Sequence, residues 1–592
     1  MLGRMTEITS SASYQRADSS RPVLETTVGG VLREAAERAA GTVALVEGTP
    51  DPGSRRRWSY ADLLAASEGV ARALLGRFAP GERVAVWAPS SPEWLLLEFG
   101  AALAGLTLVT VNPALRTGEL AFVLGQSGVQ GVALAPVYRG ADLAETLAQV
   151  RGQLPGLREV ISFADWDSFA DSGSPTERLP EVQPDDAAQI QYTSGTTGFP
   201  KGAVLHHRGI TNNARFCAEI LQAGPGEVWV NPMPLFHTAG CVLFTLGPVQ
   251  GQFTQVLPPG FDPGLVLHLI ESERGTIFGG VPSMLLAQLD HPDFTGRDLS
   301  RVRCAFCGGA TAPPALVRRV ESALGVPFSI VFGQTESSPV ITQTRLADSP
   351  ADRAETLGRP HPQVEVQISD PLTGQTVPTG VTGEICTRGY HVMTGYFDNP
   401  EATAEAIDTA GWLHTGDLGS MDERGYCRVE GRVKEMIIRG GENIYPREIE
   451  QLLYAHPGVA DVAVVGVPDD YWGEQVAAFV RPAPDSPATQ DELASYCRAR
   501  LAAHKTPRVL DLRRRLSPHR LWQGPEIRPP GAVHLRHNPD GTLAAWDGPR
   551  TRLDMICEIY GMIFAPAAGH EISPRAGWRC WCHTPAHESN DR

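Results

Sequence analysis

Two kinds of hydrophobic pattern alternate along most of this chain. Segments with helical spacing, such as VLREAAERAA and YADLLAASEGVARALLGRF, alternate with short apolar runs such as RVAVWA and LTLVTV. Alternation of this kind predicts strand–helix units on a largely parallel sheet. It extends from Val28 to about Ile190 and resumes between Gly209 and Val331. The predicted fold class is therefore α/β, with several parallel-sheet subdomains.

The pattern changes at two places further along the chain. Between Val364 and Gly431 short strands and turns predominate, as in VEVQISD and GEICTRG, which predicts a small β-rich subdomain. After Lys434 the segments IEQLLYAHPGVADVAVV and DELASYCRARLAAH describe a compact α+β unit. We predict a disordered lead-in at 1–27, a large region at 28–433, a mobile C-terminal domain hinged at Lys434 and spanning 434–511, and an atypical tail at 512–592.

Length, charge and cysteine usage narrow the class of protein. A chain of 592 residues is too long for one hydrophobic core, and its formal charge of −16 argues against a nucleic-acid-binding protein. The polar N-terminal segment lacks the apolar core of a signal peptide, and no apolar run reaches the roughly 20 residues that span a bilayer. The ten cysteines are scattered, and CAFCGG lacks a second pair of zinc ligands. We expect reduced thiols, a cytoplasmic location and no transmembrane segment.

Lysine is rare in this sequence, so each lysine calls for a chemical reason. Only Lys201, Lys434 and Lys505 are lysine among 51 basic residues. Lys201 follows closely spaced glycines and hydroxyl residues in YTSGTTGFPKG, where the backbone can turn around a ligand and N–H and hydroxyl groups can donate to phosphate oxygens. The alternative is an ordinary polar surface loop. We predict a polyphosphate-binding loop of Thr193, Ser194, Gly195, Thr196, Thr197 and Gly198, with Lys201 as its cation.

The phrase YTSGTTGFPKG resembles the signature of the adenylate-forming (AMP-binding) superfamily, in particular the acyl-CoA synthetases. The resemblance covers about Val28 to Pro507, with further phrases in the family's order. CGGA resembles the segment that borders adenine. FGQTE resembles the segment in which an aromatic ring stacks on adenine, a threonine meets the α-phosphate and a glutamate helps to hold Mg²⁺. In WLHTGD the resemblance implies an aspartate that binds both ribose hydroxyls. The implied nucleotide contacts are Gly309, Ala310, Phe332, Gly333, Gln334, Thr335 and Asp417, with Glu336 as the metal ligand.

Several of these residues have a structural alternative. Phe332 could be a core residue, Glu336 a solvated charge at a helix start, and Asp417 a turn residue. The resemblance places His237, in PLFH, beside the acyl pocket and the reacting carboxylate, and a lone histidine there could equally be a buried structural residue. The ordered conjunction of the phrases favours the functional interpretation.

The segment GRVKEMIIRGGENIYPREIE resembles the family's hinge and the start of its mobile C-terminal domain. The resemblance implies that Arg432 meets the ribose and phosphate and that the small domain rotates about Lys434. It further implies that Arg439, Gly440 and Gly441 bind coenzyme A, because two glycines let the backbone approach the pantetheine arm.

The implied reaction has two steps and uses ATP, Mg²⁺ and coenzyme A. A carboxylate attacks the α-phosphorus of MgATP to give acyl-AMP and pyrophosphate, and a thiol then displaces AMP. VFGQTESSPVITQT and RGYHVMTGYFDNPEATAEAID most resemble the fatty-acid-activating branch, and we predict a medium-chain acid. Two alternatives stay open. One is an enzyme that loads an amino or aryl acid onto a carrier protein, and the other is a catalytically impaired nucleotide- or acyl-binding protein.

The end of the chain departs from the family. The family supplies a further catalytic lysine for the first step in a phrase like PLTGSGK, and this chain has no lysine after Lys505. If the codons permitted for LRRRLSPHRLWQGPEI, residues 512–527, are read one base later, they can encode FVDAFPLTGSGKVQKF. We therefore predict a frameshift near 509–511, in the gene or in its reading, and slow adenylation by the chain as written. The alternative is a genuine divergent tail.

Overall fold

The computed structural model describes residues 12–193, 200–439, 442–469, 472–483 and 487–512. Parallel pairs β4–β5, β4–β6, β6–β9 and β5–β10 form the greater part of a seven-stranded sheet. Antiparallel strands β11 and β21 complete one edge. The strand order is β21 (Gly395–Tyr396), β11 (Lys201–His206), β10 (Ala187–Thr193), β5 (Thr107–Val111), β4 (Arg83–Trp87), β6 (Gly131–Leu134) and β9 (Glu159–Ser162).

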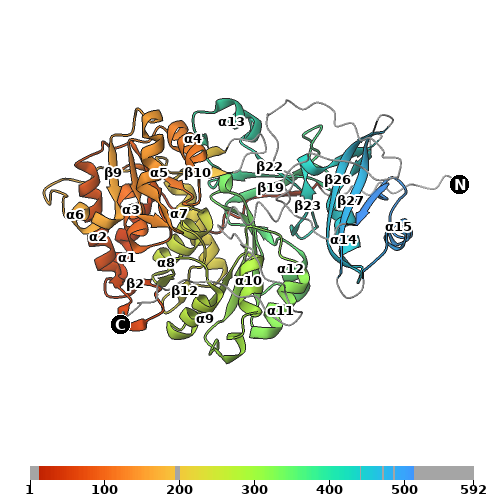
Figure 1. The fold of residues 1–592 in the computed structure, drawn as a ribbon, viewed down its shortest axis with the longest axis horizontal. Coiled ribbons are helices and arrows are strands. Elements are labelled where there is room, and N and C mark those ends of the chain that lie inside the picture. The colour runs from red at the N-terminus through yellow and green to blue at the C-terminus, as the bar shows by residue number, and fades with distance from the viewer. Residues whose placement is uncertain (1–11, 194–199, 440–441, 470–471, 484–486, 513–592) are drawn as a thin grey trace, which may run out of the picture. The chain divides into compact units, whose positions relative to one another are not determined.

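Helices of the predicted strand–helix units surround this sheet, and α1, α2 and α3 pack against one another (Figure 1). Side-chain caps fix several helix starts; Ser59 and Asp62 form a reciprocal capping box at the start of α2. The helices are α1 (Val28–Ala39), α2 (Tyr60–Leu75), α3 (Pro92–Leu103), α4 (Thr117–Ser127), α5 (Leu143–Val150), α6 (Trp166–Ala170), α7 (His207–Ile220) and α8 (Phe244–Gly251). A small hairpin joins β7 (Val137–Tyr138) and β8 (Ala141–Asp142).

Two further sheets follow the same α/β principle. One has the order β12 (Val228–Val230), β13 (Thr254–Leu257), β2 (Val43–Glu47) and β3 (Arg57–Ser59). The other has the order β14 (Ile277–Gly280), β15 (Cys304–Cys307), β16 (Phe328–Gly333), β17 (Val340–Gln343) and β18 (Arg359–Pro360). Helices α9 (Pro263–Ser272), α10 (Pro282–Leu289), α11 (Pro314–Leu324) and α12 (Pro350–Glu355) belong to this part of the chain. Apolar residues from both sheets share one core that includes Val256, Phe278 and Phe328.

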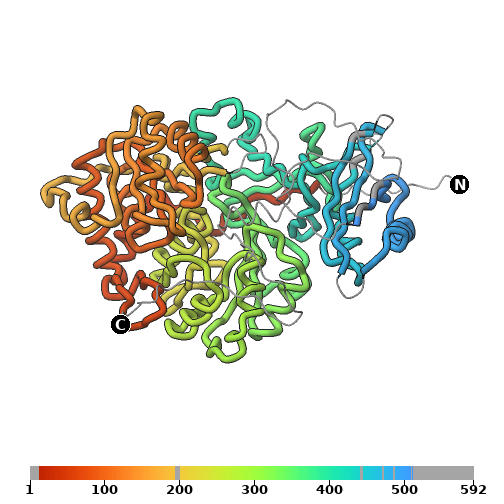
Figure 2. The backbone as a smooth tube through the Cα atoms, viewed as in Figure 1, coloured from red at the N-terminus to blue at the C-terminus, as the bar shows by residue number. Residues whose placement is uncertain are grey.

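The predicted β-rich subdomain is an antiparallel sheet that also recruits the start of the described chain. Its order is β1 (Tyr14–Gln15), β19 (Val364–Ser369), β20 (Gly383–Gly389), β22 (Leu413–Met421) and β23 (Cys427–Arg432), with α13 (Pro400–Ala406) between β21 and β22. Figure 2 shows the red N-terminal segment running among these green strands. The prediction of a disordered lead-in through residue 27 is therefore wrong for residues 12–27: Ser13 is fully buried, and its carbonyl accepts a hydrogen bond from the backbone N–H of Ile368. Residues 1–11 lie outside the described residues.

The C-terminal domain has a hydrophobic core of its own, which starts at Ile437 and includes Leu453, Val476 and Leu510. Its sheet has the order β25 (Glu442–Ile444), β24 (Ile437–Arg439), β27 (Gly473–Pro482) and β26 (Val459–Asp469), and β28 (Val509–Leu512) pairs with β27 in parallel. The helices are α14 (Pro446–Tyr454) and α15 (Gln490–Arg498).

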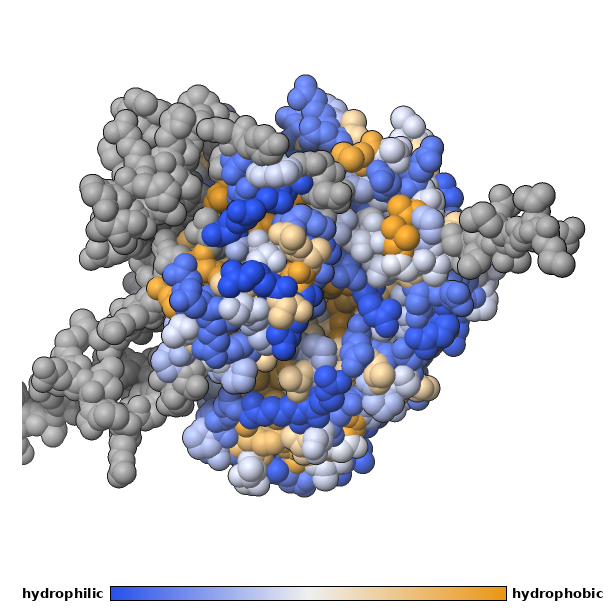
Figure 3. Space-filling view, turned by 90° about the vertical axis from the view of Figure 1, so that its right-hand side faces the viewer, coloured by the Kyte–Doolittle hydropathy of each residue, from blue (hydrophilic) through white to orange (hydrophobic). Residues whose placement is uncertain are grey.

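The surface is mainly polar where it is described. Figure 3 shows a face on which hydrophilic residues predominate and hydrophobic residues are scattered. Large exposed apolar side chains include Leu372, in the turn after β19, and Tyr454, at the end of α14. Among the described residues, no helix combines the length and hydrophobicity needed to cross a bilayer. The seven cysteines that the structure describes are all buried free thiols.

Candidate active site

The predicted phosphate loop connects two antiparallel strands of the large sheet. Thr193 is the last residue of β10, Lys201 is the first residue of β11, and the two are cross-strand partners. Ser194, Gly195, Thr196, Thr197 and Gly198 lie outside the described residues. The hairpin therefore fixes both ends of the loop and brings the Thr193 hydroxyl and the Lys201 cation to the same end of the sheet.

Glu336 reaches this hairpin from a different sheet. It lies in the short 3₁₀ turn Thr335–Ser337 that follows β16, and it is 8% exposed. Its Oε1 accepts hydrogen bonds from the Thr193 hydroxyl at 3.2 Å and from the Tyr396 hydroxyl at 2.8 Å. The carboxylate predicted to hold Mg²⁺ and the loop predicted to bind phosphate thus share direct contacts.

Tyr396 completes the cluster and was not singled out by the sequence. Its strand β21 pairs with β11, and the Lys201 Nζ lies 5.0 Å from the centroid of its ring. Burial raises the pKa of Tyr396, and the adjacent Glu336 carboxylate raises it further. The phenol therefore stays protonated near neutral pH and donates to Glu336, while its ring face contacts the lysine cation.

The predicted adenine-side segments lie at the carboxyl ends of neighbouring parallel strands. β15 and β16 pair in parallel; Gly309 and Ala310 follow β15, while Gln334 and Thr335 follow β16. Ligands of open α/β sheets bind at this edge. A side chain at Gly333 would place its Cβ 1.9 Å from the carbonyl oxygen of Pro339, so the backbone there admits only glycine. The structure thus brings CGGA and FGQTE together.

Phe332 is half-buried and packs against the core of the β-rich subdomain, beside Ile341 and Val364. This placement keeps both interpretations of Phe332, since the residue packs against the core and is only half-buried.

Asp417 and Arg432 are neighbours across two strands of the β-rich sheet. They are register partners on β22 and β23, and the Arg432 Nε lies 3.0 Å from the Asp417 Oδ1. The aspartate is 7% exposed overall, whereas the arginine side chain is 51% exposed. Asp417 therefore lies on a paired strand and not in an isolated turn. The ion pair orients a carboxylate that can accept two hydroxyl protons.

His237 precedes a π-helical turn, Ala239–Leu243. The Phe236 carbonyl accepts a hydrogen bond from the Thr110 hydroxyl at 3.0 Å, which ties this segment to β5. The His237 carbonyl accepts from the backbone N–H groups of Gly240 and Cys241. The imidazole is half-buried and lies 4.8 Å, centroid to centroid, from the Phe236 ring. The backbone of His237 is thus well anchored, and its ring is partly accessible.

The predicted hinge and coenzyme A residues lie where the core of the C-terminal domain begins. Lys434 is exposed in the 3₁₀ turn Val433–Glu435, directly after β23. Arg439 is buried on β24; its Nε donates to the Gln475 Oε1 at 2.8 Å, and its guanidinium stacks 4.6 Å from the Trp472 ring centroid. Gly440 and Gly441 lie outside the described residues. In this structure the Arg439 guanidinium therefore stabilises the C-terminal sheet itself.

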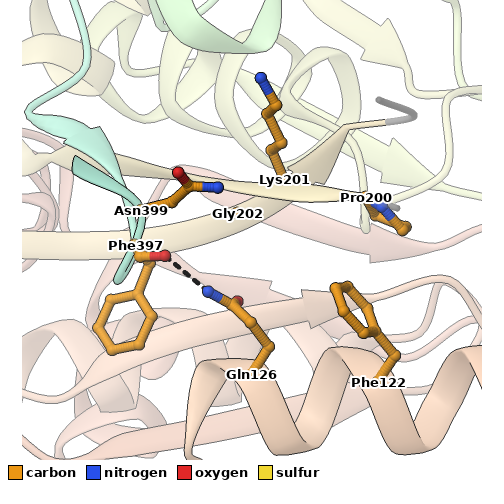
Figure 4. Close-up of a pocket in the computed structure, with 7 residues that line it drawn as sticks. All are labelled: Phe122, Gln126, Pro200, Lys201, Gly202, Phe397 and Asn399. Carbon is orange, nitrogen blue, oxygen red and sulfur yellow. Dashed lines mark hydrogen bonds between the residues drawn. The ribbon is translucent and has the colours of Figure 1, made fainter. Parts of the chain in front are cut away.

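A cavity of about 110 Å³ lies behind the hairpin strand β11. In Figure 4 the Lys201 side chain points away from Gln126 and Phe122, which lie below the strand on α4. The Gln126 Nε2 donates to the Phe397 carbonyl at 2.6 Å, and the Tyr192 hydroxyl bonds to the Gln126 Oε1. These contacts brace the hairpin from behind. The Gln126 side chain thus supports the hairpin, and the Lys201 ammonium group points away from this cavity.

The sequence matches the family model "AMP-binding enzyme" over residues 32–397 and the model "AMP-binding enzyme C-terminal domain" over residues 448–520. The chain belongs to the AMP-binding enzyme family. The C-terminal match extends past the boundary predicted at residue 512, and the frameshift stays a prediction.

Curated relatives of this AMP-binding enzyme are acyl-CoA synthetases by name. The chain is 40% identical over 518 residues to YngI of Bacillus subtilis (strain 168), which covers 82% of this chain and 93% of the relative. It is 35% identical over 538 residues to the mitochondrial medium-chain acyl-CoA ligase ACSF2 of Danio rerio, with 85% and 87% covered. The chain is accordingly an AMP-forming acid–thiol ligase, and ATP and coenzyme A are its substrates with the acid.

Two solved structures share the fold of this chain. ATP-bound MatB from Rhodopseudomonas palustris has a TM-score of 0.74 at 28% identity, covering 82% of this chain and 95% of that chain. A Mycobacterium tuberculosis fatty acyl CoA synthetase has a TM-score of 0.69 at 30% identity, covering 88% and 96%. The predicted α/β fold with a C-terminal domain is confirmed.

Proposed function

We propose that this AMP-binding enzyme activates a medium-chain fatty acid through acyl-AMP to acyl-CoA. The similarity to ACSF2, a medium-chain acyl-CoA ligase, supports the chain length, and the fold shared with a fatty acyl CoA synthetase supports the acid class. The observation that carries the proposal is the contact of Thr193, Lys201, Glu336 and Tyr396, because it joins an anion-binding hairpin to a carboxylate suited to Mg²⁺.

The first step places the triphosphate of ATP at the β10–β11 hairpin. Lys201 supplies a cation to the phosphate oxygens, and Asp417, oriented by Arg432, accepts the ribose hydroxyls. Both hydrogen bonds to Glu336 end on Oε1, so we assign Oε2 to the metal; oxygen donors of this kind are the ligands that Mg²⁺ prefers. When bound, Mg²⁺ neutralises charge on the phosphate oxygens. We place Gly309, Ala310 and Phe332 at the adenine.

Bond changes then follow from the positions proposed for the acid and the thiol. A carboxylate oxygen of the fatty acid, beside His237, attacks the α-phosphorus, and pyrophosphate leaves. In the second step the coenzyme A sulfur attacks the acyl carbonyl carbon, AMP leaves with the bonding electron pair, and the thiol proton passes to solvent. We assign rotation between the steps to Lys434 and the pantetheine contacts to Arg439, Gly440 and Gly441. A cytoplasmic location stays a prediction from the sequence.

Pyrophosphate release with a panel of acids tests this proposal. Octanoate should give a higher kcat/KM than butanoate or palmitate, and coenzyme A should accept the acyl group from the resulting acyl-AMP. Preference for an aryl or amino acid, followed by transfer to a carrier-protein thiol in place of coenzyme A, would establish the carrier-loading alternative. Binding of ATP and octanoate without any pyrophosphate release would establish the impaired binding protein.

A further inference from the structure

Three side chains with metal-binding atoms converge on two neighbouring inner strands of the β-rich sheet. Glu384 and Cys386 are two positions apart on β20, so they lie on the same face, and His414 on β22 is the cross-strand partner of Cys386. The His414 Nδ1 lies 2.8 Å from the Glu384 Oε2 and 3.5 Å from the Cys386 Sγ. One ligand atom from each residue lies within 4.8 Å of the other two.

We propose that Glu384, Cys386 and His414 form a binding site for Zn²⁺. Sulfur, imidazole nitrogen and carboxylate oxygen are the three donors that Zn²⁺ takes in proteins, and three protein ligands leave a fourth tetrahedral position for water or another ligand. Cys386 is fully buried, whereas the His414 side chain is 30% exposed, so an ion can enter from the histidine side. On binding, the ion displaces the proton between the His414 Nδ1 and the Glu384 carboxylate, and the Cys386 thiol also loses its proton to solvent, so that the sulfur binds as a thiolate.

Groups behind two of the three donors are carboxylate and backbone groups of the same subdomain. The second ring nitrogen of His414, Nε2, lies 3.9 Å from the Asp408 Oδ2, which places a carboxylate behind the ring, beyond hydrogen-bond distance. The other oxygen of Glu384, Oε1, accepts a hydrogen bond from the backbone N–H of Gly416 at 2.9 Å. The carboxylate is thus anchored at one oxygen and presents the other to the cluster.

This site differs from the carboxylate assigned to Mg²⁺ in its donors and in its location. Glu336 offers oxygen among hydroxyl groups, which suits a hard cation, whereas a thiolate and an imidazole favour Zn²⁺ or Co²⁺ over Mg²⁺. The zinc site is also linked to the nucleotide side, because Gly416 directly precedes Asp417 and adopts a left-handed φ of +71°. A bound ion would brace the irregular stretch of β22 that carries Asp417.

Cobalt binding to the full-length chain tests the proposal. After treatment with a chelator and removal of the chelator, the protein is titrated with Co²⁺ in excess Mg²⁺. One equivalent should produce a thiolate-to-cobalt charge-transfer band in the near ultraviolet and strong visible bands of a tetrahedral ion. Added Zn²⁺ should abolish both sets of bands. Absence of the thiolate band from the parent protein would overturn the proposal.

Variants assign the bands to residues. Cys386→Ser should remove the charge-transfer band, and His414→Asn should weaken Co²⁺ and Zn²⁺ binding by more than about 100-fold, because a ligand is lost. Cys427→Ser is the matched control, since Cys427 is a buried cysteine on β23 of the same sheet, and it should leave the titration unchanged. His414 is partly exposed, so His414→Asn decides the question if Cys386→Ser does not fold. A full-intensity band in Cys386→Ser, or unchanged affinity in His414→Asn, contradicts the assignment.

Discussion

Charged residues at the proposed nucleotide site make contacts between two sheets, whereas charged residues of the C-terminal domain make contacts within that domain. Around the hairpin, Lys201 and Glu336 come from two sheets and both contact Tyr396: the cation lies 5.0 Å from the ring centroid, and the carboxylate accepts from the hydroxyl groups of Tyr396 and Thr193. In the C-terminal domain, the Arg439 Nε donates to Gln475 and its guanidinium lies over the Trp472 ring, and Lys505 donates to Glu448 at 2.7 Å, all within that domain.

This difference bears on the two half-reactions. The groups proposed for ATP are assembled within the large region, where they could bind nucleotide whatever the C-terminal domain does. The described part of the C-terminal domain forms its own core. Lys505 and the buried Arg439 both make their contacts within that domain. The chain has no lysine after Lys505 to bring to the nucleotide. Binding of substrates should therefore survive, while the rate of adenylation should suffer.

Removal of the Glu336 charge should have the largest effect. Glu336→Gln keeps the shape and a carbonyl acceptor for Thr193 and Tyr396 but removes the anion assigned to the metal. We expect acyl-AMP formation to fall by roughly 10²–10³-fold. Stopped-time assays of pyrophosphate release at saturating octanoate measure this rate. Glu405 is an exposed glutamate on α13, and Glu405→Gln is the control. A rate within twofold of the parent, whatever the Mg²⁺ concentration, would remove Glu336 from the metal site.

The hinge variant Lys434→Pro should affect the second half-reaction. Proline fixes φ near about −65° and should hinder rotation at the turn Val433–Glu435. We expect thioester formation from preformed acyl-AMP to slow by roughly 10²-fold, as small misplacements of reacting groups do. Lys434→Ala, which leaves the backbone free, should lose much less. If both half-reactions keep the parent rates in the proline variant, Lys434 is an ordinary linker residue.

Lys201→Ala removes the cation of the phosphate loop. It should weaken the use of ATP more than the use of the acid. The loss of a hydrogen bond to a charged group costs about 1.5–3 kcal/mol, so kcat/KM for MgATP should fall roughly 10–100-fold. The KM for octanoate should change far less. Equal losses for both substrates would show that the variant disturbs the hairpin as a whole, and an unchanged MgATP dependence would place Lys201 outside the site.

Tyr396→Phe should have the smallest effect of these substitutions. It removes the hydroxyl that donates to Glu336 at 2.8 Å and keeps the ring that faces Lys201. One such hydrogen bond contributes about 0.5–1.5 kcal/mol. We therefore expect the Mg²⁺ concentration at half-maximal rate to rise by roughly twofold to tenfold. Tyr396→Leu, which also removes the ring, should add a defect in the KM for ATP. Identical Mg²⁺ dependence in parent and Tyr396→Phe would contradict the role given to this hydroxyl.

The sequence predicted those features that depend on local pattern. Short apolar runs located strands such as Arg83–Trp87, helical spacing located helices such as Val28–Ala39, and the ordered phrases located Lys201, Glu336 and Asp417. The family resemblance carried their roles, since no spacing along the chain relates residue 201 to residue 336.

Features that depend on strand register were not predictable in this way. Tyr396 meets Glu336 only because β21 pairs with β11, and Cys386 meets His414 only because β20 and β22 pair in one register. The segment after Ala12 has no apolar run to indicate a strand, and the partner strand β19 holds Tyr14 and Gln15 in the sheet. GEIC and WLHTGD carry the donors of the proposed zinc site, but their spacing of about thirty residues matches no zinc motif that the sequence could disclose.

The most direct test compares the chain as written with a version in which FVDAFPLTGSGKVQKF replaces residues 512–527 and the alternative frame continues. One assay supplies ATP, octanoate and coenzyme A, and the other supplies preformed octanoyl-AMP and coenzyme A. A lost charged contact to the transition state costs ~3–4 kcal/mol, so the chain as written should adenylate roughly 10²–10³-fold more slowly than the restored version. Thioester formation should differ much less. If the chain as written forms acyl-AMP as fast as the restored version, the account of the missing lysine is wrong.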